Sequence, residues 1–215
     1  MSAMVSFAGH EPEAKSVFDG TTLKGWTNAA GTGPGSGWVV EDGTIYLKTP
    51  HSDDLYLEGE YGDFTFAFEW KIPEGANSGV KYKVKAFGKS WLGPEYQLLD
   101  DEKHPDSKVG PKHQTGAFYD ILPPDSTKKH LKPVGEWNSS KIIVEGTKFQ
   151  HWLNGELVME VDTTSDKFKE GIAASKFKKT EGFALNPTGR IFLQDHGNHI
   201  WFRNLKLAAS DSGKK

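Results

Sequence analysis

The stretch Asp63–Trp70 (DFTFAFEW) decides the fold class, because aromatic residues alternate with other residues along it. Four aromatic residues occupy every second position, and Thr65, Ala67 and Glu69 occupy the positions between them. Successive side chains of a β-strand point to opposite faces of its sheet. We therefore expect a strand whose aromatic face points into a core. Glu69 is expected on the opposite face, beside small residues that leave room for a ligand.

The same period-two alternation recurs along the rest of the chain. It predicts strands over Val80–Ala86, Glu95–Asp100, Gly116–Ile121, Asn138–Glu145, Lys148–Leu153, Glu156–Val161, Arg190–Asp195 and His199–Leu207. Asn154-Gly155 predicts a two-residue hairpin turn, because both residues tolerate positive φ. One short helix is expected at about Ser165–Lys178, where apolar residues recur at helical spacing. Many strands without a βαβ rhythm favour two packed antiparallel sheets.

Nothing in the 215 residues divides the chain, because it shows no internal repeat and no linker. We predict one domain over residues 16–207, an N-terminal extension over residues 1–15 and a flexible polar tail over residues 208–215. The first residues lack a charged region followed by a sustained apolar stretch, so they do not read as a signal peptide. No apolar run approaches the length of a membrane span.

The composition excludes several classes of protein. The chain has no cysteine, which excludes disulfides, thiolate metal sites and a cysteine nucleophile. Lys and Arg total 26 against 29 Asp and Glu, so there is no basic footprint for nucleic acid. We interpret the alternating lysines Lys81, Lys83 and Lys85 as the solvated face of a strand. Aromatic residues make up 12% of the chain, and aromatic rings among polar groups suit carbohydrate, which stacks on rings and forms hydrogen bonds.

A series of segments resembles, in order, the 3-keto-disaccharide hydrolase domain family, formerly a domain of unknown function. The segments are Phe18–Trp26, Trp38–Gly43, Asp63–Trp70, Asn77–Val80, Gly93–Asp100, Thr115–Asp120, Gly135–Asn138, His151–Gly155, Gly189–Gly197 and Phe202–Asn204. The resemblance spans roughly Ser16 to Leu207. It implies the concanavalin A-like lectin/glucanase fold, an all-β jelly-roll sandwich of two antiparallel sheets. Members are often exported, which implies a periplasmic or secreted protein, whereas a native N-terminus as given would imply the cytoplasm.

The strongest cluster of candidate site residues lies in Glu95–Asp101 (EYQLLDD). Glu95 and Gln97 share one face of the predicted strand, and apolar residues on the other face point to the core. We therefore expect Glu95 and Gln97 to line a groove. Glu69 is expected to face the same groove, where two carboxylates about 5 Å apart would suit a retaining glycosidase. The alternative is that each carboxylate pairs with a cation, such as Arg203.

Gln194 and His196 show the same geometry near the end of a later strand. Both alternate with Leu193, a predicted core residue, and so are expected in the groove. His196 could serve as base, acid or metal ligand. A structural role is the alternative for this histidine. In the loop after the Glu95 strand, His113 is favoured over His104, because the residues around His113 resemble the family.

Three further residues are candidates for binding substrate. Trp91 precedes the Glu95 strand and is predicted to be a stacking platform for a sugar ring. Asn77 ends a loop and either bonds a sugar hydroxyl or forms a turn. Arg203 either meets a substrate oxygen or anchors Glu69, and structural pairing is the favoured role.

A divalent cation such as calcium is the one cofactor that the residues suggest. Glu95, Asp100 and Asp101 offer the oxygen ligands that a hard cation prefers, although turn formation also explains the two aspartates. No phosphate loop or dinucleotide fingerprint occurs. We expect no nicotinamide, flavin or haem.

The resemblance implies an enzyme that cleaves glycosidic bonds of sugars already oxidised to a ketone at C3. The ketone acidifies the neighbouring C2–H, so a base can remove that proton and the C1 substituent can leave. The base would be His196, His113 or a carboxylate, Glu95 or Glu69. A cation or a cationic side chain would stabilise the enolate, and water addition would complete net hydrolysis. The expected partner is a carbohydrate; the oligomeric state is left open.

Two alternatives remain. A conventional glycoside hydrolase would use Glu69 and Glu95 as its two carboxylates. A non-catalytic, lectin-like module would need aromatic rings and amides, but neither the histidines nor the acids.

Overall fold

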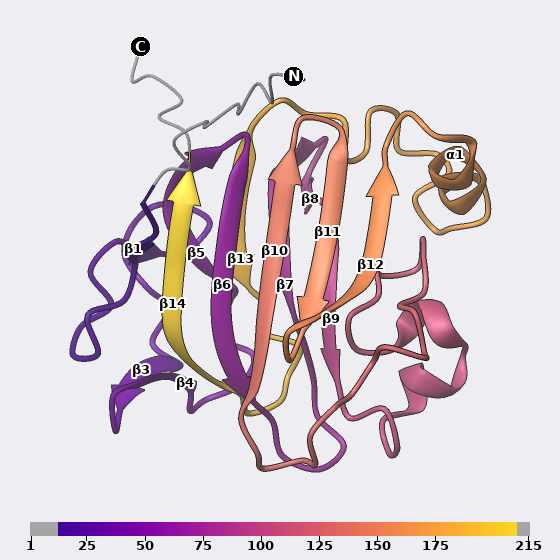
Figure 1. Ribbon diagram of the computed structural model, residues 1–215. Coiled ribbons are helices and arrows are strands. Elements are labelled where there is room, and N and C mark those ends of the chain that lie inside the picture. The colour runs from indigo at the N-terminus through magenta and orange to yellow at the C-terminus, as the bar shows by residue number, and fades with distance from the viewer. Residues whose placement is uncertain (1–12, 210–215) are drawn as a thin grey trace, which may run out of the picture.

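The computed structural model describes residues 13–209 and consists of two antiparallel sheets packed face to face (Figure 1). In the eight-stranded sheet, β1 pairs with β14 at the side of the strand path. The path runs β12 (Glu156–Asp162), β11 (Lys148–Leu153), β10 (Asn138–Glu145), β6 (Phe64–Lys71), β14 (Trp201–Ala209), β4 (Thr44–Leu47) and β3 (Trp38–Glu41), and β1 is Lys15–Ser16. The two-sheet antiparallel sandwich predicted from the alternation is confirmed.

The six-stranded sheet covers the inner face of the first. Its path runs β2 (Trp26–Thr27), β5 (Leu55–Tyr61), β13 (Gly189–Leu193), β7 (Asn77–Phe87) and β8 (Ser90–Leu92), and β9 (Glu95–Leu99) also pairs with β7. One α-helix, α1 (Asp166–Ala173), follows β12, and two short 3₁₀ turns, η1 (Pro105–Lys108) and η2 (Pro111–His113), follow β9. None of the helices within residues 13–209 is long and apolar enough to cross a membrane.

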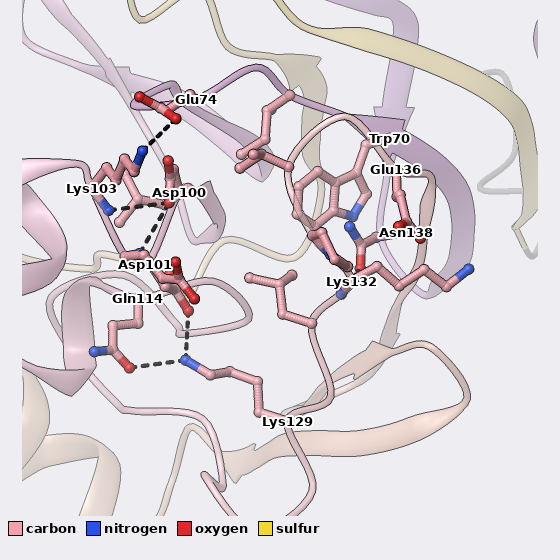
Figure 2. A pocket seen from close by; sticks show the side chains of 16 residues that line it. Trp70, Glu74, Asp100, Asp101, Lys103, Gln114, Lys129, Lys132, Glu136 and Asn138 are labelled. Carbon is pink, nitrogen blue, oxygen red and sulfur yellow. Dashed lines mark hydrogen bonds and ion pairs between the residues drawn. The ribbon is translucent and has the colours of Figure 1, made fainter.

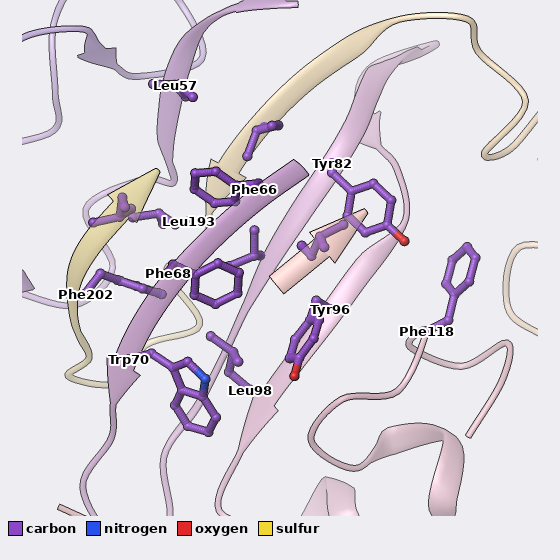
Figure 3. Packing of buried hydrophobic residues seen from close by; sticks show 14 of the residues in the cluster. Leu57, Phe66, Phe68, Trp70, Tyr82, Tyr96, Leu98, Phe118, Leu193 and Phe202 are labelled. Carbon is purple, nitrogen blue, oxygen red and sulfur yellow. The ribbon is translucent and has the colours of Figure 1, made fainter. Parts of the chain in front are cut away.

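The aromatic face of β6 forms the centre of the core, as the alternation predicts. Phe66, Phe68 and Trp70 are at most 2% exposed and pack against residues of the six-stranded sheet (Figure 3). The Trp70 indole N–H donates a hydrogen bond of 2.9 Å to Ser140 Oγ. Tyr96 of β9 meets Phe68 edge-to-face, with ring centroids 5.9 Å apart. Thr65, Ala67, Glu69 and Lys71 therefore lie on the opposite face of the sheet, away from the core.

His151 is a buried polar group within this core. Its Nδ1 lies 3.1 Å from the carbonyl oxygen of Gly116, which only accepts, so Nδ1 donates. Its Nε2 then accepts from the hydroxyl of Tyr82 at 2.9 Å. Both nitrogens are satisfied by a neutral ring, and burial lowers the pKa of His151 to about 3.

The predicted strand over Gly116–Ile121 is wrong. Gly116 and Asp120 have positive φ values of 83° and 62°, which interrupt an extended chain. Phe118 forms isolated bridges to Tyr96 and Leu122 instead of a ladder. The apolar side chains are buried all the same, because a compact turn can also bury alternating residues.

Other boundaries differ by smaller amounts. The Asn154-Gly155 hairpin is confirmed, with both residues at positive φ. The helix ends at Ala173 rather than Lys178, and Phe177 stacks on Phe183 beyond it. Strand β14 continues to Ala209, so the first residues of the predicted tail belong to the sheet. The rest of that tail, residues 210–215, and residues 1–12 of the predicted extension lie outside the described residues.

Candidate functional site

Four side chains form a row across the outer face of the six-stranded sheet. Phe192 pairs with Tyr56 of β5 on one side and with Lys81 of β7 on the other. Lys81 pairs in turn with Glu95 of β9. Directly paired residues share a face, and the residues next to them along the strands belong to the core. The row therefore marks the face turned away from the core, which we call the site face.

Glu95, Lys81 and Gln194 form a compact polar network on the site face. The Lys81 ammonium lies 3.6 Å from Glu95 Oε2. The Gln194 amide, oriented to satisfy both neighbours, donates to Glu95 Oε1 at 3.3 Å and accepts from Lys81 at 3.2 Å. The Glu95 side chain is only 7% exposed. The prediction that Lys81 is solvated is wrong, because its ammonium is drawn into this network.

A glycine makes room for the Glu95 carboxylate. Gly79 lies on β7 directly opposite Gln97, next to Glu95 on the same face. A Cβ atom at residue 79 would lie 2.6 Å from Glu95 Oε1, closer than such atoms ever approach. The side chain of Glu95 therefore folds over β7 at the one position where no Cβ blocks it.

A hollow of about 370 Å³ adjoins this network; we call it the histidine hollow. Its lining consists of Asn77, His104, Pro105, Asp106, Val109, Tyr119 and His196. It continues the site face, because residues 77, 79 and 81 alternate on one side of β7. His196 is exposed at its rim, and its ring centroid lies 6.5 Å from that of His104, edge to face.

Two buried acceptor oxygens beside the hollow have no hydrogen-bond partner. They are Oδ1 of Asn77 and Oε1 of Gln97, on side chains of residues that are 2% and 1% exposed. A buried polar atom without a partner costs about 1–3 kcal/mol, so such atoms usually serve a bound molecule or water. Of the two residues, Asn77 lines the hollow, whereas Gln97 does not line it and donates through its Nε2 to Asp106.

Asp106 organises the wall of the hollow. Its carboxylate accepts from His113 Nδ1 at 2.9 Å and from Gln97 Nε2 at 3.4 Å. Burial, together with the charge of Asp106, raises the pKa of Tyr119. The Tyr119 hydroxyl therefore remains protonated at neutral pH.

His113 is not placed to act as a base. Its Nδ1 is taken by Asp106 and its Nε2 lies 3.2 Å from Asp120 Oδ1. With a carboxylate on each nitrogen, the ring has no free nitrogen for a substrate proton. His113 therefore joins η1 to the turn at residue 120 through these two contacts. The histidine of this loop that lines the hollow is His104.

Glu69 lies with Arg203 on the other outer surface of the sandwich, so the predicted place of Glu69 in the groove is wrong. Both belong to the eight-stranded sheet, where Arg203 of β14 pairs with Glu69 of β6. Arg203 Nε donates to Glu69 Oε2 at 2.7 Å, and the guanidinium lies 4.1 Å from the Trp137 ring centroid. The ion pair favoured for Arg203 is confirmed. The core separates Glu69 from Glu95, so they are no carboxylate pair.

The structure does not bring Glu95, Asp100 and Asp101 together as a metal site. Asp100 accepts hydrogen bonds from the backbone N–H groups of residues 75, 102 and 103. Asp101 accepts from the backbone of Thr115 and from the Lys129 ammonium at 2.7 Å (Figure 2). Within residues 13–209, no three His, Asp or Glu side chains gather closely enough to hold an ion. These residues therefore do not fit a divalent cation, and the two aspartates act as turn formers.

Asp100 and Asp101 instead line a larger pocket, of about 550 Å³, at the end of the sandwich (Figure 2). Trp70, Leu99 and Asn138 also line it. The carboxylates of both aspartates already have partners, and neither unpartnered buried acceptor lies there. The smaller histidine hollow is therefore the candidate site.

Trp91 lies at the edge strand β8 and is 40% exposed. Its ring approaches Tyr56 edge-to-face at 6.5 Å, and the Arg190 guanidinium lies 5.6 Å from its ring centroid. Beneath it, Tyr56 and Phe192 belong to an apolar cluster outside the main core. Its position beside the row of Tyr56 and Phe192 suits the predicted stacking role.

Sequence reasoning missed Asp54, which precedes β5. Its Oδ1 accepts from the backbone N–H of Asp195 at 2.9 Å. Burial raises the pKa of Asp54 to about 6, against the lowering effects of that hydrogen bond and of Lys81. Acids with such pKa values are characteristic of functional sites. Two adjacent aspartates before an apolar strand were the only signal.

The comparison with known proteins identifies the family. Residues 13–208 match the model of the 3-keto-alpha-glucoside-1,2-lyase-like domain. The chain belongs to this family. A relative from Bacteroides thetaiotaomicron, named 3-keto-disaccharide hydrolase, is 32% identical over 227 aligned residues, which cover 91% of this chain and 78% of the relative.

Solved structures agree with the fold. A protein from Parabacteroides distasonis, named provisionally as a glycosyl hydrolase, is 33% identical, with a TM-score of 0.82 and coverage of 92% of this chain and 94% of its own. A carbohydrate-binding module from Bacillus subtilis is 14% identical, with a TM-score of 0.54 and coverage of 86% and 96%. At that identity the likeness concerns the fold alone.

Proposed function

We propose that this chain is a carbohydrate-active enzyme that cleaves the glycosidic bond of 3-keto-glycosides on the site face. The carrying observation is the Glu95–Lys81–Gln194 network beside the histidine hollow, whose lining includes Asn77, the residue of an unpartnered acceptor oxygen. Sugar hydroxyls donate to such acceptors and also accept from a lysine. Membership of the 3-keto-alpha-glucoside-1,2-lyase-like family supports the choice of a keto sugar.

His196 takes the proton from C2 of the substrate. It lies at the open rim of the histidine hollow. Glu95, by contrast, already has a partner on each carboxylate oxygen. The electron pair of the broken C2–H bond forms a C2=C3 bond, and the ketone oxygen becomes an enolate oxygen.

Collapse of the enolate breaks the glycosidic bond. The C3=O bond forms again, a C1=C2 bond forms, and the C1–O bond breaks, so its electron pair leaves with the alkoxide. Solvent water at the open rim supplies the proton that the alkoxide takes up. The hydroxide that this water leaves then adds to C1, and His196 returns its proton to C2, which gives net hydrolysis.

The polar network holds the sugar while the proton moves. Lys81 donates a charged hydrogen bond to a sugar oxygen, and Glu95 and Gln194 keep its ammonium in place. Asn77, which lines the hollow, accepts from a hydroxyl on the same face of the ring. The conventional two-carboxylate hydrolysis is not proposed, because Glu69 and Glu95 lie on different sheets.

The test is to incubate the protein with a 3-keto-glucoside and with its unoxidised parent, each with and without a chelator. We expect turnover of the keto sugar alone, and no effect of the chelator. Turnover of the parent would support an ordinary glycoside hydrolase. Binding of both sugars without turnover would support a lectin-like module. Either of these outcomes would overturn the proposal.

A further inference from the structure

His104 has a proton position that the backbone dictates. It caps the 3₁₀ turn η1, where its Nδ1 lies 3.1 Å from the backbone nitrogen of Asp106. A backbone N–H can only donate, so Nδ1 must accept and cannot carry a proton. The neutral ring therefore carries its proton on Nε2. A second proton on Nδ1 would place two N–H groups against each other.

The surroundings of His104 favour the same neutral state. Burial lowers its pKa, and the charge of a protonated His196 would lower it further, whereas Asp106 and Asp100 raise it less than burial lowers it. Asn77 and Tyr119, the other polar residues of the hollow, are uncharged at neutral pH. No group among residues 13–209 accepts a hydrogen bond from His104 Nε2. The Nε2–H is thus a donor without a protein partner.

We infer that His104 is a fixed neutral hydrogen-bond donor that contacts the ketone oxygen of the substrate through Nε2–H. This inference rests on the proposed function and assigns a second histidine to it. The C2 hydrogen and the C3 oxygen sit on neighbouring carbon atoms, so the groups that act on them must lie close together. The rings of His104 and His196 line one hollow with centroids 6.5 Å apart, which suits this arrangement.

The two histidines then have different tasks because their surroundings differ. His196 has an exposed ring and can accept a proton. His104 is held in one tautomer and stabilises the oxygen on which negative charge develops. A positioned donor to such an oxygen is worth roughly 10²- to 10³-fold in kcat.

Two substitutions separate the two nitrogens of His104. His104→Asn keeps an acceptor for the Asp106 N–H but loses a donor at the Nε2 position. His104→Gln keeps a donor near that position and weakens the cap. We expect His104→Asn to unfold like the parent protein, yet to lose about 10²-fold in kcat on the 3-keto-glucoside with little change in KM. We expect His104→Gln to retain kcat within about tenfold, with the pH profile unmoved.

An active His104→Asn variant, or two folded variants that are both inactive, would overturn the inference. ¹⁵N NMR of the histidine rings gives a test that does not depend on turnover or on the variants. We expect the His104 signals of a ring protonated at Nε2 at pH 8; a proton on Nδ1 would overturn the inference. If the wild-type protein cleaves no keto-glycoside, the proposed function fails, and the NMR result still stands by itself.

Discussion

The two outer faces of the sandwich each carry a carboxylate paired with a cation, but the two pairs differ. On the eight-stranded sheet, Glu69 and Arg203 meet at 2.7 Å, with side chains 29% and 40% exposed. On the six-stranded sheet, Glu95 and Lys81 stand 3.6 Å apart, with side chains 7% and 20% exposed. The closer pair is thus the more exposed one.

The difference between the two pairs indicates which face carries the candidate site. An exposed pair in close contact is fully satisfied and contributes little, typically below about 1 kcal/mol. The pair on the site face is more buried and lies beside acceptors that have no partner. A buried polar group that lacks a hydrogen-bond partner lowers the stability of the free protein. Such a group is found where a bound ligand supplies the missing partner.

The largest effect should come from removing the charge of each carboxylate in turn. Glu95→Gln is expected to lower turnover of the 3-keto-glucoside about 10²-fold, because both Lys81 and Gln194 lose the carboxylate that positions them. The free energy of unfolding should fall by only about 1–2 kcal/mol, because Lys81 can still reach solvent. The matched variant Glu69→Gln should keep turnover within about twofold. Equal losses in the two variants would show that the faces do not differ in this way.

The free energy of unfolding should also depend on pH through His151, which is buried in the core between the two faces. The pKa of His151 is about 3 in the folded chain, whereas its ordinary value is 6.5, so the unfolded chain binds more protons between these values. The stabilising contribution of neutral His151 is then fully present above about pH 7 and falls as the pH drops. From pH 6.5 to pH 4 this histidine alone should lower the free energy of unfolding by about 3 kcal/mol, whereas the raised pKa of Asp54 acts in the opposite direction. Urea unfolding of the parent and of His151→Phe isolates the histidine contribution as the difference between their slopes. His151→Phe should start less stable and show a flatter slope; an unchanged slope would contradict the assignment.

Removing the cation of each pair tests the same comparison, with a smaller expected effect. Lys81→Met should cost roughly 30-fold in kcat/KM, the value of one charged hydrogen bond of about 2 kcal/mol. Arg203→Met should leave kcat/KM unchanged and lower stability by less than about 1 kcal/mol. Steady-state kinetics with the keto sugar measure both. A larger catalytic loss in Arg203→Met would move the site to the other face.

Removing a third cation, Lys83, is expected to have the smallest effect of these changes. Within residues 13–209 no ion pair reaches it, its ammonium lies 5.3 Å from the Phe149 ring centroid, and burial lowers its pKa. Stability should therefore rise as pH approaches 10, because the folded chain releases this proton first. Lys83→Met should raise the free energy of unfolding at pH 7 by about 1 kcal/mol. A loss of stability in this variant would show that Lys83 has a favourable role.

The sequence by itself determined the class of fold and the inward face of each long strand. Alternation in Asp63–Trp70 predicts which side chains enter the core, because a strand has a period of two whatever its neighbours are. The Asn154-Gly155 turn follows from the backbone preferences of its own two residues. Strands β1 to β4, of two to four residues each, offered too few residues for a period to show, and β5 buries three successive residues instead of alternating ones.

Only the tertiary structure decided which outward residues meet. Alternation assigns Glu69 and Glu95 each to the outside of its own sheet, but strand order decides which sheet that is, and it separates them. Pairing across strands brought Lys81 beside Glu95. A loop contact selected His104 and occupied both nitrogens of His113. The physical reason is that period two is local, whereas pairing between strands and loops joins residues far apart in the chain.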